Sequence, residues 1–164
     1  MRRIEEQPMF ENCRLIFKNF SGTPSDYNRE GDRNFCVVIE DQEVAKRMKS
    51  DGWNVKFLAA RDESEDDLAY LPVAIAFGNR PPTVVMLTHN GRTRLDEDMI
   101  GMLDYAEIEN IDLIVRPYNW ERNGKSGVKA YTKSLYVTLK EDALARKYAN
   151  IDTSDDVDAP PFDV

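Results

Sequence analysis

One segment of the sequence combines aliphatic side chains with a cation and two large aromatic rings in a two-residue repeat. In Ile111–Trp120 the early odd positions are aliphatic, whereas Arg116, Tyr118 and Trp120 occupy even positions near the end. Successive side chains of a β-strand point to opposite faces, so these three share the face away from the aliphatic residues. Rings stack on unpaired bases for about 1–3 kcal/mol each, and arginine and lysine contact phosphates. The spacing therefore predicts a strand that binds single-stranded nucleic acid.

Two other predicted strands repeat this combination of cations and rings on one face. The residues are Arg14, Lys18 and Phe20 in the first strand, and Lys129, Tyr131 and Lys133 in the last. The opposite face of the first strand carries Cys13, Leu15 and Phe17, which we expect in the core. A purely structural explanation stays open, because aromatic residues favour strands and lysines protect exposed strands from pairing. The recurrence in three strands favours a binding surface, with the rings as stacking platforms and the cations as phosphate contacts.

The last strand contains a conflict of parity. Tyr131 and its neighbouring lysines have the same parity as the aliphatic residues from Leu135 onward, which also look like core residues. Either the closing hairpin projects beyond the barrel, with its tip exposed on both faces, or a β-bulge re-aims the strand. The loop 121–127 is polar and contains two glycines, which favours the projecting hairpin. Its cations Arg122 and Lys125 extend the predicted contact surface.

A polar loop between the first two predicted strands, residues 21–33, mixes rings and cations with small polar residues. Tyr27, Arg29 and Arg33 belong to it. Two interpretations are equally open: the loop folds over a bound strand, or it only connects two strands.

Most of the chain is predicted to form short strands separated by turn residues. The expected strands are Asn12–Phe20, Asn34–Glu40, Trp53–Leu58, Leu71–Phe77, Thr83–Thr88, Ile111–Trp120 and Val128–Leu139. A helix is expected over Gln42–Ser50, between the N-cap Asp41 and the terminating Gly52, with shorter helices at Asp96–Asp104 and Glu141–Tyr148. This pattern predicts a mainly β fold, namely an OB-like barrel with a few short helices and a projecting β-hairpin.

The last thirteen residues differ in composition from the rest of the chain. They contain five aspartates, no basic residue, and Phe162 behind a pair of prolines. Such a segment cannot bury enough apolar surface to offset its ordering entropy. We therefore expect a folded domain over residues 1–150 and a disordered acidic tail over residues 151–164. The tail either solubilises the protein, or recruits partners and competes for the domain's own basic groove. The residues expected to contact a partner are Asp155, Asp156, Asp158 and Phe162.

The net charge of −8 does not exclude a polyanionic ligand, because the charge is unevenly distributed. Asn110–Asn150 holds eight lysines and arginines against four acids, and Asn79–Arg94 holds three arginines and no acid. No apolar run approaches the roughly 20 residues that span a bilayer, and the N-terminus lacks the apolar stretch of a secretory signal. The two cysteines are not in a paired spacing, which is typical of free thiols in a reducing compartment. These features predict a cytoplasmic protein without a membrane partner.

Catalytic constellations are scarce in the sequence. His89, the only histidine, precedes an Asn-Gly turn and has no carboxylate or cysteine at ligand spacing, so we expect it to be a surface turn residue. Asp96, Glu97 and Asp98 are compatible with a divalent-metal nuclease site. However, adjacent helix positions point in different directions, and acids at a helix start are explained by capping and the helix dipole. We predict no cofactor, no metal site and no enzymatic activity.

The chain resembles the phage-encoded OB-fold single-stranded DNA-binding proteins in RLIFKNFSG, in YNREGDRNFCVVIED, in WNVKFL and in the closing strand pair. The resemblance spans most of residues 12–140, and it implies a protein that coats single-stranded DNA during phage replication or recombination without base-specific readout. The tail is similar to that of bacterial single-stranded DNA-binding proteins, which end in an acidic run and Ile-Pro-Phe. Here Pro161 and Phe162 are followed by Asp163 and Val164. The similarity implies replication or recombination proteins as partners of the tail.

Two other classes of function stay open on the sequence alone. One is a protein-interaction module, such as a phage assembly component, whose aromatic faces meet another protein. The other is a metal-dependent nuclease. RNA in place of DNA, and assembly into a homo-oligomer, are also compatible with the sequence.

Overall fold

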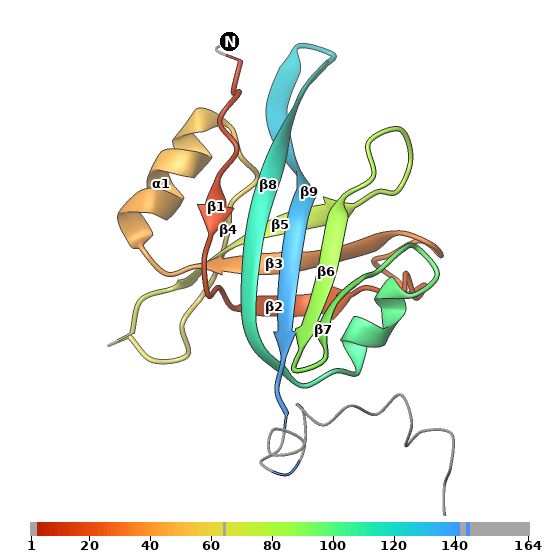
Figure 1. Ribbon diagram of the computed structural model, residues 1–164. Helices are drawn as coiled ribbons and strands as arrows, with labels where there is room; N and C mark the ends of the chain where they lie inside the picture. Colours follow the sequence, from red (N-terminus) through yellow and green to blue (C-terminus); the bar gives the residue numbers. More distant parts are fainter. Residues whose placement is uncertain (1–2, 64, 142–143, 145–164) are drawn as a thin grey trace, which may run out of the picture.

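The computed structural model describes residues 3–63, 65–141 and 144, which form nine strands, one α-helix and one 3-10 helix (Figure 1). The strands are β1 (Met9–Phe10), β2 (Leu15–Asn19), β3 (Arg33–Ile39), β4 (Lys56–Leu58), β5 (Leu68–Ile75), β6 (Thr83–Thr88), β7 (Gly91–Arg94), β8 (Ile108–Arg122) and β9 (Lys125–Leu139). The helices are α1 (Gln42–Asp51) and η1 (Ile100–Asp104). The mainly β prediction is confirmed, and the short strands β1 and β7 are additional to the expected ones.

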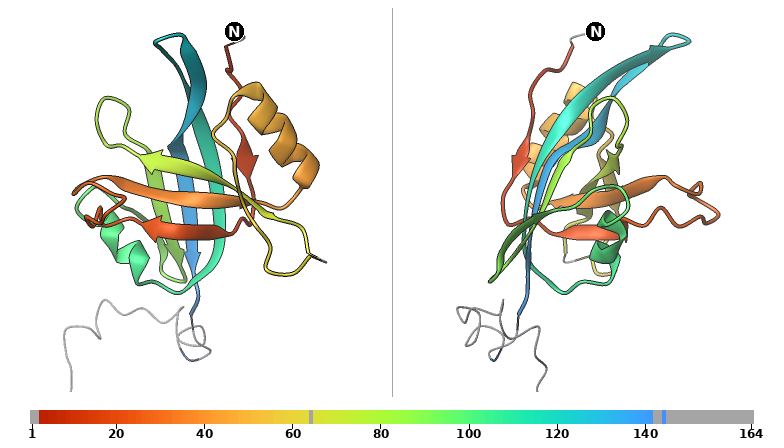
Figure 2. Two further views of the ribbon diagram at one scale, coloured as in Figure 1. Left: turned by 180° about the vertical axis from the view of Figure 1, so that it is seen from behind. Right: turned by 45° about the vertical axis from the view of Figure 1, so that its right-hand side comes forward.

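All nine strands belong to one sheet, whose main path is β1-β8-β9-β5-β3-β2. No ladder closes the path between β1 and β2, but these two strands follow one another in the chain. In this segment the amide of Cys13 donates to the carbonyl of Ile111 on β8, and the carbonyl of Arg14 accepts from the amide of Val38 on β3 (both 2.9 Å). The segment therefore passes from β8 to β3 and brings the two ends of the path together. The result is a partly open barrel of the OB type, in which β8, β9 and β6 cross β2, β3 and β5 (Figures 1 and 2).

The core fills the barrel from alternating positions of the strands. Every second residue of β5, from Ala69 to Ile75, is buried, and β3 and β8 contribute Phe35 and Leu113 in the same way. This two-residue period is what a sheet requires when only one of its faces is buried. The half-buried residues between them therefore form the outer face of the barrel.

Helix α1 begins and ends at the expected capping residues. The carboxylate of Asp41 accepts hydrogen bonds from the amides of Glu43 (2.9 Å) and Val44 (3.3 Å), and Gly52 ends the helix at a left-handed φ of 110°. The carbonyl of Gly52 accepts from the amide of Val128 (2.9 Å). This bond ties the end of the helix to β9.

A bulge in β2 reverses the predicted faces of the first strand. The β2–β3 register shifts between Ile16 and Asn19, so the side-chain alternation does not continue across Phe17. Phe20 is fully buried, with its ring 5.6 Å from that of Phe35, whereas 61% of Phe17 is exposed. The prediction that Phe20 is a stacking platform and Phe17 a core residue is therefore wrong. The bulge places Phe17 at a φ of 52°, a strained conformation for a bulky residue that costs about 1–3 kcal/mol.

A second bulge resolves the conflict of parity in β9. Ile114 pairs with Ser134 but Val115 pairs with Thr132, so Lys133 is the extra residue. Between the hairpin tip and the bulge the even-numbered residues Val128, Ala130 and Thr132 are buried. After the bulge the odd-numbered residues Leu135 and Val137 are buried instead. The bulge therefore accounts for the shared parity of Tyr131 and Leu135, while the tip residues 120–126 are exposed, as the projecting hairpin predicted. The hairpin still projects, because its last turn extends beyond the rest of the sheet (Figure 2).

The predicted last helix, Glu141–Tyr148, lies almost entirely outside the described residues. The predicted acidic tail and its boundary with the folded domain, at residues 150–151, lie outside them completely. None of the helices that the structure describes is both long and apolar enough to cross a membrane.

Candidate nucleic-acid interface

Four predicted contact residues form one cluster on the outer face of the β8–β9 hairpin. The ladder pairs Arg116 with Tyr131 and Tyr118 with Lys129. The two tyrosine rings meet edge to face at 6.1 Å, and the Tyr131 ring centre lies 5.1 Å from the Lys129 ammonium and 5.7 Å from the Arg116 guanidinium. We call these four residues the hairpin cluster. Arg116 and Lys129 both make cation–π contacts with the Tyr131 ring. Such a contact contributes roughly 0.5–1 kcal/mol at an exposed site.

The same face of the hairpin continues to its tip. Trp120 pairs with Gly127, and Arg122 pairs with Lys125. The Trp120 ring packs against the backbone of Gly127 so closely that a Cβ atom there would lie 2.8 Å from Cζ2 of the ring. Trp120 remains 39% exposed. Three rings and four cations predicted from the sequence thus share one exposed surface.

Two depressions of the surface meet at Tyr131. The first is lined by Arg116, Pro117, Tyr118, Asn119 and Tyr131 of the hairpin, by Arg3, and by Ala76, Gly78, Asn79 and Arg80 of the loop between β5 and β6. The second is lined by Lys129 and Tyr131, by residues 31–34, by residues 74–77 and by Glu97. We call their union the Tyr131 groove, because this residue borders both parts.

The groove contains Arg33 from the loop prediction and two arginines that the prediction missed. Arg33 bonds to the Glu97 carboxylate (3.3 Å), which holds its guanidinium at the edge of the second depression. Arg3 and Arg80 line the first depression. The excess of arginine in residues 79–94 was a signal for Arg80, whereas nothing in the sequence pattern indicated Arg3.

The other two loop residues, Tyr27 and Arg29, are exposed but are not among the residues that line the groove. Tyr27 is 99% exposed. The loop has its own hydrogen bonds: the side-chain amide of Asn28 donates to the carbonyls of Thr23, Arg29 and Asp32, each at 3.0 Å. The loop is therefore ordered by its own hydrogen bonds. Its closure over a bound strand stays a prediction.

Three of the cations predicted on strand faces lie outside the groove. Arg14 and Lys18 line a depression with residues 108–111, at the opposite end of β8 from the hairpin cluster. Lys133, at the bulge, donates to the Oε1 of Gln7 (2.7 Å). Arg14 and Lys18 therefore line a different depression from Tyr131, and the three predicted strands do not all contribute to one common groove.

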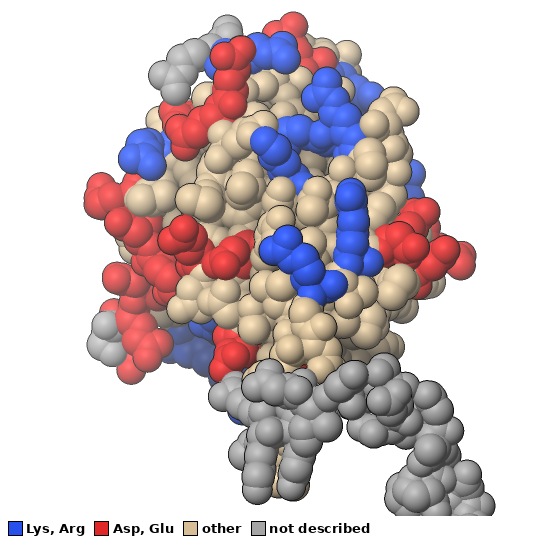
Figure 3. All heavy atoms as spheres, viewed as in Figure 1, with Lys and Arg blue, Asp and Glu red and all other residues tan. Residues whose placement is uncertain are grey.

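Charge is segregated on the surface. On the face that carries β8, β9 and β6, lysine and arginine side chains gather over the middle of the view, whereas acidic side chains gather at the left, toward the loop after β4, and at the right-hand edge (Figure 3). That loop contains the acidic run 62–67 noted in the sequence. A polyanion is therefore attracted to the hairpin side despite the net charge of the chain.

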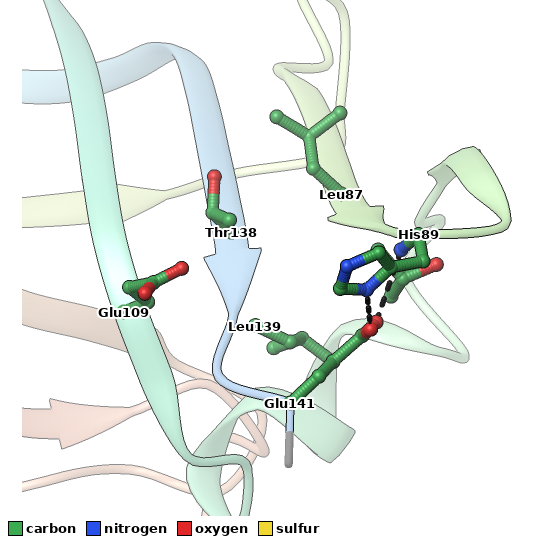
Figure 4. Close-up of a pocket in the computed structure, with 7 residues that line it drawn as sticks. Leu87, His89, Glu109, Thr138, Leu139 and Glu141 are labelled. Atoms are coloured by element: carbon green, nitrogen blue, oxygen red, sulfur yellow. Dashed lines mark hydrogen bonds and ion pairs between the residues drawn. The ribbon is translucent and has the colours of Figure 1, made fainter. Parts of the chain in front are cut away.

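A separate depression surrounds His89. The carboxylate of Glu141 accepts a hydrogen bond from the amide of His89 (3.0 Å) and forms an ion pair with Nδ1 of its ring, while Glu109 and Thr138 line the other side (Figure 4). His89 is exposed at the end of β6, as predicted. Its carboxylate partner, Glu141, lies 52 residues away in the sequence, so the residues near His89 could not predict this contact. The pair joins the β6–β7 turn to the end of β9.

The acids at Asp96–Asp98 act as a structural cap. Oδ1 of Asp96 accepts from the amides of Asp98 and Met99, both at 3.0 Å. Within the part of the chain that the structure describes, no group of three or more His, Cys, Asp or Glu residues could hold a metal ion. Asp96 thus makes the capping bonds that the sequence predicted for these acids, whereas Glu97 bonds to Arg33.

Comparison with known proteins adds the following similarities. A family model for phage ssDNA-binding domains matches residues 1–160. The single-stranded DNA-binding protein from bacteriophage Enc34 aligns with 96% of this chain and 97% of its own, at 11% identity and a TM-score of 0.51. The same phage protein in complex with ssDNA aligns with 87% of this chain and 95% of its own, at 10% identity and a TM-score of 0.50. At these identities the structural likeness concerns the fold, and no curated protein sequence matches.

Proposed function

The chain belongs to the family of phage ssDNA-binding domains, and from this premise we propose that it coats and protects single-stranded DNA, without sequence specificity, during phage DNA replication or recombination. Single-stranded DNA is its ligand as a member of this family. The observation that carries the proposal is the hairpin cluster, in which two cations contact the half-buried ring of Tyr131 beside the exposed ring of Tyr118.

We infer that the bound strand follows the outer face of the hairpin and the Tyr131 groove. Bases stack on Tyr131, Tyr118 and Trp120, because every base has an aromatic face and stacking does not depend on its identity. Phosphates contact the cations between the rings, which are Arg116, Arg122, Lys125 and Lys129, with Arg33 and Arg80 at the borders of the groove. This arrangement explains binding without sequence specificity.

Trp120 provides a direct test. Trp53 is buried whereas Trp120 is 39% exposed, so a bound base changes the fluorescence of Trp120. We expect poly-dT to quench the fluorescence strongly, duplex DNA to quench it weakly, and added salt to weaken the binding of poly-dT. In the control variant Trp120→Phe the quenching disappears while binding, followed with a labelled oligonucleotide, is retained in part. Wild-type protein that binds neither DNA by either readout contradicts the proposal.

We further propose that the chain acts as a binding protein without catalysis, cofactor or metal, in the cytoplasm of the phage host. Incubation of labelled single-stranded DNA with the protein and Mg²⁺ then leaves the DNA at full length. Degradation that follows the protein through purification contradicts this part of the proposal.

The acidic tail, residues 151–164, is proposed to recruit replication or recombination proteins and to compete with DNA for the basic groove. The five aspartates of this segment carry the opposite charge to the hairpin cations, as DNA phosphates do. Deletion after Asn150 should raise the apparent affinity for single-stranded DNA, most of all at low salt. Unchanged or weaker binding contradicts the competition.

A further inference from the structure

A second cluster, of two rings and a cation, lies on the outer face of the barrel, away from the hairpin. The exposed ring of Phe17 meets the ring of Tyr70 on β5 edge to face, with centres 5.7 Å apart. Tyr70 belongs to the half-buried positions of β5, between the buried residues Ala69 and Leu71. Both rings therefore lie on the outer face.

The backbone at Phe17 has an unfavourable conformation that holds this ring outward. A φ of 52° is rare for any residue with a side chain and rarer for a bulky one. The bulge also leaves an apolar ring 61% exposed, when an uninterrupted strand would bury it. Neither cost is offset by a core contact of Phe17. Strain of this kind is concentrated at functional sites.

A cation lies beside this pair, as in the hairpin cluster. Lys56 of β4 lies directly opposite Tyr70 in the β4–β5 ladder. Burial raises the pKa of the Cys36 thiol to about 11, and the positive charge of Lys56 acts against that shift. Cys36 lies on the neighbouring strand β3, so the positive charge of Lys56 acts on groups of the outer face of both β5 and β3.

Between the two clusters the outer face of β3 and β5 carries no charged side chain on its central positions. Its floor is formed by small or neutral side chains, half-buried in two adjacent strands: Asn34 and Cys36 of β3, and Pro72 and Ala74 of β5. Ala74 pairs with Tyr131, and Tyr70 lies four residues earlier on β5. From the rise of a strand and the spacing between strands, Tyr70 and Tyr131 are about 14 Å apart.

We propose that Phe17 and Tyr70 form a second base-stacking subsite, with Lys56 as its phosphate contact. A single strand of DNA then crosses the outer face of β5 and β3 between this subsite and the Tyr131 groove. The inference rests on the proposed function, since it extends the path of the same ligand.

The test measures the affinity of the full chain for oligo-dT of increasing length, over about 4 to 16 nucleotides, the range of site sizes for one OB fold. The variants are Phe17→Ala and Tyr131→Ala. The matched control is Tyr105→Ala, which removes a ring that is 88% exposed after η1, outside both clusters. Thermal unfolding of each variant confirms that it is folded.

We expect Phe17→Ala to weaken binding of the longer oligonucleotides by roughly five- to 150-fold, the effect of one lost base stack, and to leave that of the shortest ones nearly unchanged. Tyr131→Ala should weaken binding at every length, and Tyr105→Ala at none. Phe17→Ala that binds all lengths like the wild type, while Tyr131→Ala binds weakly, overturns the second subsite and leaves the proposed function intact. An equal loss in Tyr105→Ala also overturns it. Wild-type protein that binds no oligo-dT refutes the proposed function itself.

Discussion

At the scale of single residues, a ring becomes a binding surface only where its surroundings keep it exposed. Tyr131 is held by an edge-to-face ring and two cations, and Trp120 by the bare backbone of Gly127. Phe20 has the same side chain as Phe17, three residues away, but lies in the core. Residue type alone therefore does not distinguish a stacking platform from a core residue.

Gly127 is predicted to be essential for the position of Trp120. A methyl group in Gly127→Ala would lie 2.8 Å from the ring, so the ring must move. We expect a changed Trp120 emission spectrum and an affinity for poly-dT reduced several-fold. Gly91→Ala is the control, since it strains the backbone at a φ of 112° in the β6–β7 turn, outside the groove, and its Cβ has no atom within 4 Å. Identical spectra and affinities for the two variants contradict the prediction.

The two cysteines are predicted to react slowly near neutral pH. Burial raises the pKa values of Cys13 and Cys36 from 9.0 to about 11, because it penalises the charged thiolate. The reactive thiolate fraction is then about a hundredfold lower than in an ordinary thiol, and it increases as the pH rises toward 11. Labelling with iodoacetamide should be correspondingly slow in the native protein and fast in urea. Equal rates in both states contradict the raised pKa values.

At the scale of elements, the two β-bulges decide what the strands display. A strand without a bulge keeps one set of residues on each face, as in β5. In β2 the bulge turns Phe17 outward. In β9 the extra residue is Lys133, so Tyr131 points outward and Leu135 points into the core although both have odd numbers. The bulges thus allow one strand to fill the core at one end and to present rings and cations on the outer face at the other.

Helix α1 offers a test of an element that supports the hairpin without touching DNA. Asp41→Ala removes the two hydrogen bonds of the N-cap, and we expect a loss of about 1 kcal/mol in the free energy of unfolding, measured in urea. Asp41→Asn, which keeps an acceptor, should lose much less. Affinity for DNA should stay unchanged in both variants. If Asp41→Ala lowers the affinity for DNA without lowering the free energy of unfolding, the N-cap affects the DNA-binding surface directly, and the prediction is wrong.

At the scale of the whole molecule, a chain with a net charge of −8 binds a polyanion because its charges are separated in space. The barrel brings the cations of the hairpin, of the N-terminal segment and of the β5–β6 loop to one groove. The acidic side chains toward the loop after β4 lie at the left of the view instead (Figure 3). The local field, and not the total charge, attracts the ligand.

This separation makes a quantitative prediction for salt. For single strands the slope of log K against log salt is about −0.7 per phosphate neutralised, so Lys129→Gln should make the slope shallower by about 0.7. Lys46→Gln on the exposed side of α1 should leave it unchanged. The measurement is a titration with poly-dT at several salt concentrations. Equal slopes for Lys129→Gln and the wild type would exclude a phosphate contact at Lys129.

Features that depend on neighbouring residues could be predicted from the amino-acid sequence. Two-residue alternation located seven strands, Asp41 and Gly52 bounded α1, and the even positions of β8 indicated the cations and rings of the proposed interface. Features that depend on pairing between distant segments became visible only in the folded chain. A bulge is a mismatch between two strands, so neither strand alone reveals it, and this is why Phe17 and Phe20 were exchanged. For the same reason the sequence did not show that Arg3 and Arg80 would join the groove and that Arg14 would not.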